Sequence, residues 1–164
     1  MQLKLQLLWV GIGCQRGTSQ QLIDRAIGQV FRENQLAENA IAGIATIDTK
    51  ASEVGLIELC RLRNLPLITF SSEILSAVCV PNPAKITQTK VGTPSVAEAA
   101  AILAASQFTP TLIASFFAGK KELGVKFLVP KQIFRLEGEP GAVTIAVSQE
   151  SRRFSPNSKF KIQN

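Results

Sequence analysis

Hydrophobic and polar positions fall into blocks whose spacing alternates between strand and helix three times in the first half of the chain. Short apolar runs are typical of buried strands, whereas apolar residues three and four positions apart are typical of the buried face of a helix. This alternation favours an α/β domain with a largely parallel sheet. The predicted elements are a strand at 3–10, a helix at 18–33, a strand at 40–47, a helix at about 51–64, a strand at 65–70 and a short helix at 72–79.

The last third of the chain adds another helix and several strand signals. Pro94 suits the first turn of a helix capped by Thr93, while Ser95 and Glu98 form a competing capping box one register later. Glycine and proline at 137–141 predict a hairpin loop, which brings antiparallel pairing into the sheet. We therefore expect a mixed, mostly parallel sheet. The further elements are a helix ending near Ser106 and strands at 111–117, 125–129 and 143–148.

Local residue choices refine the ends and faces of these helices. Thr18 with Gln21 forms a capping-box pattern at the start of the first helix, and Gly55 weakens the first turn of the second. Ser71 or Ser72 caps the short helix. The positions expected to be buried are Ile23, Ala26, Ile27, Val30 and Phe31 in the first helix, Leu56, Leu59, Cys60 and Leu62 in the second, and Val96, Ala99, Ala100 and Leu103 in the helix after Thr93.

Length and composition indicate one globular domain, which we place at residues 1–150. A chain of 164 residues, 46% hydrophobic, is long enough to bury a single core. No apolar run approaches the roughly 20 residues that a membrane span needs, and the N-terminus lacks the features of a secretory signal. The three scattered cysteines form neither a disulfide framework nor a metal motif, so we expect a reducing, cytoplasmic setting.

The net charge of +6 is concentrated at the C-terminus. Residues 151–164 contain four basic residues and no acid, whereas residues 1–150 carry 14 basic and 12 acidic residues. We expect the last segment to be a disordered polar tail, which can touch RNA or a membrane surface weakly. The few aromatic residues argue against a dedicated nucleic-acid binder.

Histidine is absent from the chain, and this excludes several kinds of chemistry. Catalytic relays of the Ser-His-Asp or Cys-His type and histidine-based zinc or haem sites are ruled out. Acid–base chemistry must therefore use carboxylates, lysines or a cysteine. We expect no metal site and no bound cofactor.

A glycine-rich junction follows the first predicted strand and opens the first predicted helix. We expect a tight loop there in which Gly11, Gly13 and Gly17 let backbone N–H groups approach a carboxylate. A dinucleotide fingerprint fails, because Arg16 stands where a glycine is needed and Asp48 is 37 residues beyond the first glycine. A phosphate- or nucleotide-binding module stays open as an alternative that rests on this loop alone.

Polar residues near the ends of neighbouring strands supply the candidate chemistry. A carboxylate and a lysine at the end of the second strand can serve as base and electrostatic stabiliser. A loop arginine suits a bidentate grip on a carboxylate, and a cysteine beside a helix N-terminus favours the thiolate. The catalytic candidates are Asp48, Lys50 and Glu53; the substrate-binding candidates are Gly11, Gly13, Cys14, Arg16, Gly17, Thr18, Thr93, Ser95 and Lys131.

Each of these candidates also has an ordinary structural interpretation. The glycines can simply form a turn, Cys14 can pack, and Thr93 and Ser95 can serve as helix caps. The residues at 48–53 can form a local ion pair with an acid at a helix N-terminus, and Arg16 and Lys131 can be solvated surface cations.

Four motifs, taken in order, resemble the C-terminal domain of CbiG, which is shared with the stand-alone protein CobE of cobalamin biosynthesis. They are Gly11-Ile12-Gly13-Cys14-Gln15-Arg16-Gly17-Thr18, Ala45 to Glu53, Val91 to Glu98, and Leu128-Val129-Pro130-Lys131. The resemblance runs from about residue 7 to residue 149. It implies a three-layer α/β/α domain with a mixed sheet.

The resemblance also implies a role in building the corrin ring. The full-length CbiG-like enzyme opens the δ-lactone of cobalt-precorrin-5A and releases acetaldehyde, and we expect this chain to lack its upstream domains. We therefore expect it to bind a polycarboxylated corrin-ring intermediate, with part of a cobalt-precorrin-5A hydrolase as the alternative. The expected partners are the corrinoid, other cobalamin-pathway enzymes or an N-terminal CbiG-type subunit, and a second copy in a homodimer.

Overall fold

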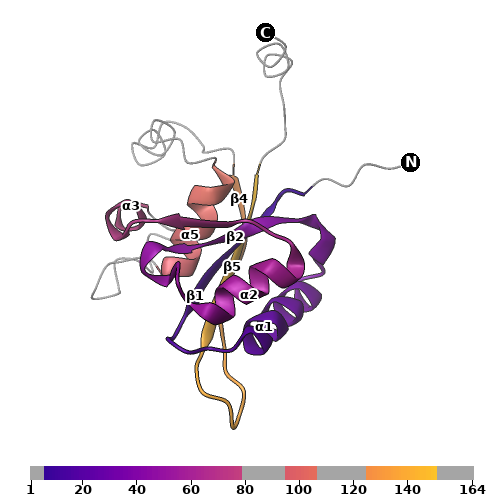
Figure 1. Ribbon diagram of the computed structural model, residues 1–164. Helices are drawn as coiled ribbons and strands as arrows, with labels where there is room; N and C mark the ends of the chain where they lie inside the picture. The colour runs from indigo at the N-terminus through magenta and orange to yellow at the C-terminus, as the bar shows by residue number, and fades with distance from the viewer. Residues whose placement is uncertain (1–5, 79–94, 107–124, 151–164) are drawn as a thin grey trace, which may run out of the picture.

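The computed structural model describes residues 6–78, 95–106 and 125–150 and contains a five-stranded sheet in the order β3-β2-β1-β5-β4. Figure 1 shows helices on both sides of this sheet. The strands are β1 (Leu8–Cys14), β2 (Ile41–Ile47), β3 (Leu67–Phe70), β4 (Val125–Phe134) and β5 (Val143–Glu150). The helices are α1 (Gln20–Glu33), α2 (Val54–Arg63), α3 (Ser72–Ser76) and α5 (Val96–Ala105), with 3-10 turns η1 (Glu38–Ala40) and η2 (Asp48–Lys50).

The sheet is mixed, as the sequence predicts. β1 pairs in parallel with β2, and β2 with β3, while β5 runs antiparallel to both β1 and β4. Four of the five described strands therefore point the same way. The predicted hairpin at 137–141 joins β4 to β5 and projects beyond the carboxyl end of β1, at the bottom of Figure 1.

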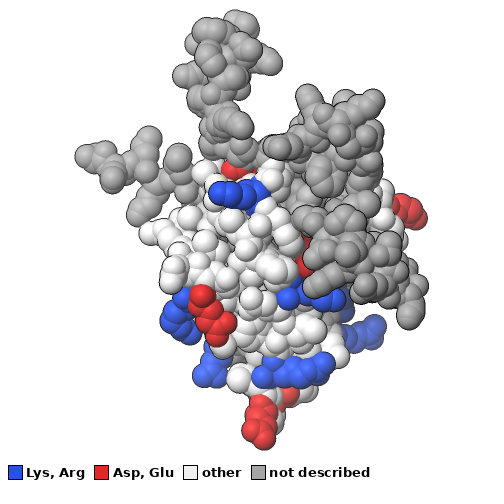
Figure 2. All heavy atoms as spheres, turned by 180° about the vertical axis from the view of Figure 1, so that it is seen from behind, with Lys and Arg blue, Asp and Glu red and all other residues white. Residues whose placement is uncertain are grey.

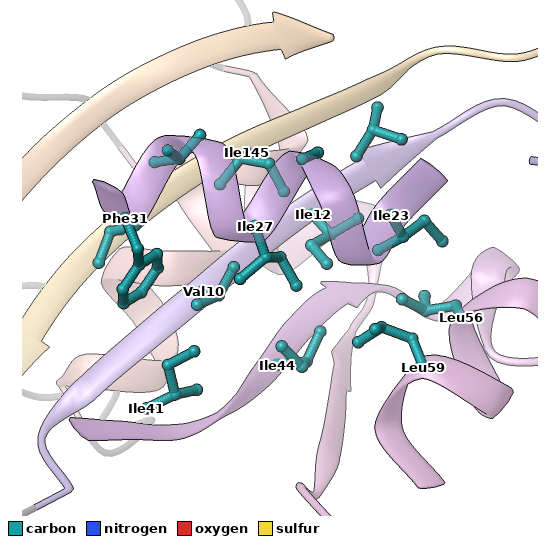
Figure 3. Close-up of a cluster of buried hydrophobic side chains, with 14 of the residues drawn as sticks. Val10, Ile12, Ile23, Ile27, Phe31, Ile41, Ile44, Leu56, Leu59 and Ile145 are labelled. Atoms are coloured by element: carbon teal, nitrogen blue, oxygen red, sulfur yellow. The ribbon is translucent and has the colours of Figure 1, made fainter. Parts of the chain in front are cut away.

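Side chains of β1 alternate between two hydrophobic layers, which confirms the three-layer arrangement. Leu8, Val10 and Ile12 face the core under α1 and α2, whereas Trp9 faces the core under α5. Figure 3 shows α1 lying over β1 and β5, with Ile23 and Ile27 directed at the sheet. Because a buried aliphatic side chain contributes about 1.5–3 kcal/mol, these two layers supply most of the drive to fold.

The first strand ends at Cys14, four residues later than predicted, and the expected tight loop at Gly11 and Gly13 is wrong. Both glycines lie inside β1, in register with Ala146 and Thr144 of β5. A Cβ on Gly11 would collide with the backbone of Ala97 in α5. The apolar run and its glycines thus form one central strand, and the first glycine is needed for close helix packing.

Helix ends and faces mostly follow the sequence, with some differences. Val96, expected to be buried, is half-buried, and the short helix expected over 72–79 ends at Ser76. Ser19, not Thr18, caps α1, since its Oγ accepts from the Leu22 N–H at 3.1 Å. The helix expected from about residue 51 begins at Val54, because residues 48–50 form a 3-10 turn instead. Leu62, expected to be buried, is 63% exposed. The buried positions expected for α1 are confirmed, as are Leu56, Leu59, Cys60, Ala99, Ala100 and Leu103, and Ser71 and Ser95 cap α3 and α5.

β4 and β5 also continue past their predicted ends, and the single tryptophan lies near this part of the sheet. β4 runs to Phe134 with two irregularities in its pairing with β5. The Trp9 indole Nε1 donates to Glu150 Oε2 at 3.0 Å and so links the start of β1 to the end of β5. The predicted strand at 111–117, the cap Thr93 and the tail at 151–164 lie outside the described residues.

Within the described ranges, none of the helices combines the length and the apolar character that crossing a bilayer requires.

The packing of α5 on β1 predicts very different costs for alanine at two glycines of the same strand. Gly11→Ala should lower the free energy of unfolding by about 2–3 kcal/mol, because the new methyl group meets helix backbone that cannot move independently. Gly13→Ala should change it by less than about 1 kcal/mol, since its Cβ would lie 3.8 Å from the Thr144 Cβ. Urea unfolding followed by circular dichroism measures both, and equal effects would contradict this packing.

Candidate functional site

The carboxyl ends of β1 and β2 lie side by side because the two strands are parallel neighbours. Residues 15–18 follow the first strand, and residues 48–50 follow the second. We call these two segments the carboxyl edge. In open α/β sheets ligands usually bind outside this end of the strands.

The loop after β1 is held in place by its own backbone and by the β4–β5 hairpin. The Gln15 N–H donates to the Ala142 carbonyl at 3.2 Å, and the Gln15 carbonyl accepts from the Thr18 N–H and hydroxyl. Thr18 is only 2% exposed. Its hydroxyl therefore orders the loop and points away from solvent.

Gly17 connects the loop after β1 to Glu53, which follows the second half of the carboxyl edge. It has a φ of +82°, which glycine adopts without strain, and its N–H donates to Glu53 Oε1 at 3.1 Å. Glu53 precedes α2, and its carboxylate makes no cap bond to that helix. The Glu53 carboxylate thus accepts from the loop N–H that we expected to bind a substrate carboxylate.

Cys14 ends β1 as a half-buried thiol, and the expected thiolate is wrong. Burial raises the pKa of Cys14 above its ordinary value, and the Glu53 carboxylate raises it further, while the Lys50 ammonium lowers it by less than burial raises it. The helix N-terminus expected to favour the thiolate begins six residues later at Gln20. Cys14 instead packs beside the core under α1 and α2.

Arg16 and Lys50 are the cations at this edge. Arg16 is exposed after β1, and Lys50 is half-buried at the end of η2, beside the exposed Asp48. Within residues 6–78, 95–106 and 125–150, none of these three side chains forms an ion pair. Both cations are therefore free to bind an anionic group.

A second group of candidates lies where α5 begins, on the other face of the sheet. Ser95 Oγ accepts from the Glu98 N–H at 3.0 Å and caps the helix. Glu98 does not complete the capping box, since its Oε2 accepts from the Lys131 N–H at 3.0 Å. Glu98 therefore positions the exposed Lys131 beside the start of α5. From the sequence we expected Glu98 only to cap the helix. Thr93 lies outside the described residues.

A hollow of about 440 Å³ lies between the N-termini of α1 and α2. Gly55 allows this close approach, because a Cβ there would collide with the Thr18 carbonyl. Glu53 and Glu58 both line the hollow, and no lysine or arginine does. Two carboxylates repel a phosphate, so the geometry does not favour the alternative of a phosphate- or nucleotide-binding loop.

Across the described ranges, no three or more Cys, Asp or Glu side chains lie close enough to hold a metal ion together.

Comparison with known proteins places these features in a family. A family model described as "Cobalamin synthesis G C-terminus" matches residues 8–148. The cobalt-precorrin-5A hydrolase of Priestia megaterium is 28% identical over 108 residues, which cover 66% of this chain and 29% of the hydrolase. This chain thus spans less than a third of that relative's length.

Solved structures show the same fold over most of the chain. The cobalamin biosynthesis protein chiG from Agrobacterium tumefaciens is 26% identical with a TM-score of 0.59, and the match covers 88% of this chain and 99% of that one. CobE, from the cobalamin pathway, is 25% identical with a TM-score of 0.60 over 91% and 98% of the two chains. A cobalamin biosynthesis protein G homolog from Sulfolobus solfataricus, 20% identical with a TM-score of 0.56, shares the fold over 88% of this chain and 36% of its own.

The surroundings of Cys14 predict how its reactivity depends on pH. The midpoint of its alkylation by iodoacetamide, followed by peptide mass spectrometry, should lie above the midpoint for the unfolded protein, because burial disfavours the thiolate. Glu53→Gln should move the midpoint down and Lys50→Met should move it up. A midpoint below that of the unfolded protein would restore Cys14 as a candidate nucleophile.

Proposed function

This chain belongs to the family of the cobalamin synthesis G C-terminus, and on that premise we propose that it binds a polycarboxylated corrin-ring intermediate at its carboxyl edge. Precursors of the corrin ring carry several acetate and propionate arms. Guanidinium and ammonium groups are the side chains best suited to such arms. The proposal makes this chain a cytoplasmic binding or handling protein of cobalamin biosynthesis.

One observation carries the proposal: two cations without ion pairs in the described residues flank the ends of adjacent parallel strands. Arg16 is exposed and offers a planar guanidinium, and Lys50 is a half-buried residue with an ammonium group. Either cation can form a charge-assisted hydrogen bond to a carboxylate. Lys131, fixed through its backbone to Glu98, adds a third cation for an arm that reaches the other face of the sheet.

The glycine loop contributes to binding only if Glu53 moves. Its Gly17 N–H is taken by the Glu53 carboxylate in this structure, and the bond is exposed to solvent. A substrate carboxylate of the same chemistry can compete for it. Binding then releases Glu53 next to Lys50 and Asp48.

The alternative is a hydrolytic role as part of a cobalt-precorrin-5A hydrolase. It is supported by the relative in Priestia megaterium and by the three candidates Asp48, Lys50 and Glu53, of which Glu53 is already anchored beside the other two. In this alternative a carboxylate acts as base and Lys50 stabilises the charge that develops as the lactone opens. Because the chain spans 29% of that relative, a further domain, an N-terminal subunit or a second copy would supply the other wall of the site.

Spectrophotometric titration with hydrogenobyrinic acid, a metal-free corrinoid, tests the binding proposal. We expect a saturable shift of the corrinoid spectrum, weakened about tenfold or more by Lys50→Ala and by Arg16→Ala, since each removes a charged contact worth roughly 1.5–3 kcal/mol. The matched control is Arg61→Ala, an exposed arginine in the last turn of α2, which should leave binding unchanged. No shift, or equal weakening in all three variants, would contradict a site at the carboxyl edge.

A second titration separates binding from hydrolysis. Incubation with a cobalt-precorrin lactone, with acetaldehyde measured enzymatically, should give binding without product if the chain only binds. Release of acetaldehyde would support the hydrolytic alternative, in which Asp48→Asn abolishes turnover while corrinoid binding survives. Lys50→Ala should then abolish turnover even at corrinoid concentrations that overcome its weaker binding.

A further inference from the structure

A second open groove lies away from the carboxyl edge, between α1 and the end of β4. It has a volume of about 630 Å³ and is lined from one side by α1 and from the other by residues 133–136. Arg25 and Arg32 are two turns apart on the same face of α1, with their Cα atoms about 10 Å apart. Arg135 lines the strand side. We call this hollow the arginine groove.

Its floor is fixed by ion pairs. Arg63 Nε lies 2.8 Å from Asp24 Oδ1, and its Nη1 lies 2.9 Å from Glu38 Oε1. These bonds join α2 to α1 and to the 3-10 turn after it, and the Arg63 side chain is only 18% exposed. Asp24 and Glu38 are thereby committed to Arg63.

The remaining arginines of the groove have no such partner in the described part of the chain. Arg25, Arg32 and Arg135 are exposed and form no ion pair there. Gln29 lies between the two on α1, but its amide nitrogen already donates to Glu33 at 2.9 Å. The groove therefore presents three free guanidinium groups around a rigid floor.

This concentration of positive charge is not a property of the whole surface. The groove lining holds four arginines and two acids, whereas the rest of the described chain holds five Lys or Arg and nine Asp or Glu. On the face seen from behind, in Figure 2, basic and acidic side chains occur near one another around an uncharged area. The groove lining thus has a net positive charge, whereas the rest of the described chain taken together has a net negative one.

The groove also has an apolar rim. Ile133 is 58% exposed, and Phe134 and Leu136 line the wall beside it. Arginines beside exposed apolar side chains are typical of protein–protein contacts. Small molecules, by contrast, are mostly bound in enclosed pockets that bury most of their surface.

We propose that the arginine groove docks an acidic polypeptide segment of a partner protein, with Asp and Glu side chains on Arg25, Arg32 and Arg135 and an apolar side chain against Ile133. Charge complementarity and the exposed apolar rim support this docking. The groove is separate from the corrinoid site, because none of the proposed corrinoid-binding residues lines it. Docking here would leave the carboxyl edge open to substrate.

Fluorescence anisotropy with the intact chain tests this docking. The probe is a fluorescein-labelled 12-residue peptide in which Glu and Asp alternate with Leu, and the control probe carries Gln and Asn in place of the acids. We expect saturable binding of the acidic probe at low salt and at least tenfold weaker binding of the control probe. The double variant Arg25→Glu/Arg32→Glu should also weaken binding at least tenfold, and Ile133→Ala should weaken it severalfold.

Matched controls decide between a specific groove and general charge attraction. Arg61→Glu with Lys126→Glu makes the same change of charge at exposed positions outside the groove and should leave the affinity within twofold. Equal losses in the two double variants, or no binding of the acidic probe, would overturn the proposal. Thermal unfolding of each variant shows whether a loss of binding reflects a loss of fold, and Arg135→Gln then provides a milder test.

Two further outcomes are distinguishable. If hydrogenobyrinic acid competes with the peptide and its own binding depends on Arg25 and Arg32, the groove is a corrinoid site and the docking proposal fails. If corrinoid binding depends on Arg16 and Lys50 while peptide binding depends on the groove, both proposals stand. If neither the wild-type chain nor any variant binds the corrinoid, the proposed function is overturned, while the peptide-docking proposal is unaffected.

Discussion

The close contact between α5 and β1 at Gly11 is the constraint on which the arrangement of the sheet edge depends. Ala97 and Ala101 of the helix pack with Ala146 of β5, so three small residues and one glycine bring backbone against backbone. Interiors are packed too tightly for such a contact to absorb an added methyl group without shifting the helix. The position of α5 in turn fixes Ser95 and Glu98, and Glu98 fixes the backbone of Lys131.

Charged side chains at the carboxyl edge and at the start of α5 have two different roles. Glu53 and Glu98 each accept from a backbone N–H in a neighbouring segment and so serve to position loops and strands. Arg16, Lys50 and Lys131 carry the opposite charge and lack ion pairs within the described ranges. The protein thus uses Glu53 and Glu98 for its own architecture and keeps these three cations available for an anionic ligand.

Much of this organisation follows from the sequence, since periodicity reflects burial directly. The spacing from Ile23 to Phe31 places one face of α1 in the core, and the hairpin at 137–141 makes the sheet mixed. The two glycines Gly11 and Gly13 predicted a turn because a glycine pair usually marks one locally. Glycine is needed at Gly11 instead because α5, which is far away in sequence, packs against it. The prediction that Thr18 caps α1 was wrong because the Thr18 hydroxyl donates to the Gln15 carbonyl. The adjacent Ser19 caps the helix instead. The Gly17–Glu53 bond and the arginine groove join residues distant in the chain, so no local pattern signals them.

The single tryptophan has a consequence for how ligands of this protein can be detected. Trp9 is 8% exposed and held by Glu150, so its emission reports a rigid, apolar site at the centre of the sheet. Trp9 lies five positions before Cys14 in β1, a distance of about 17 Å along an extended strand. A chromophore at the carboxyl edge would sit close enough to quench that emission by energy transfer, whereas a colourless peptide in the arginine groove would leave it unchanged. Trp9 fluorescence therefore distinguishes corrinoid binding at the carboxyl edge from peptide binding in the arginine groove without any label.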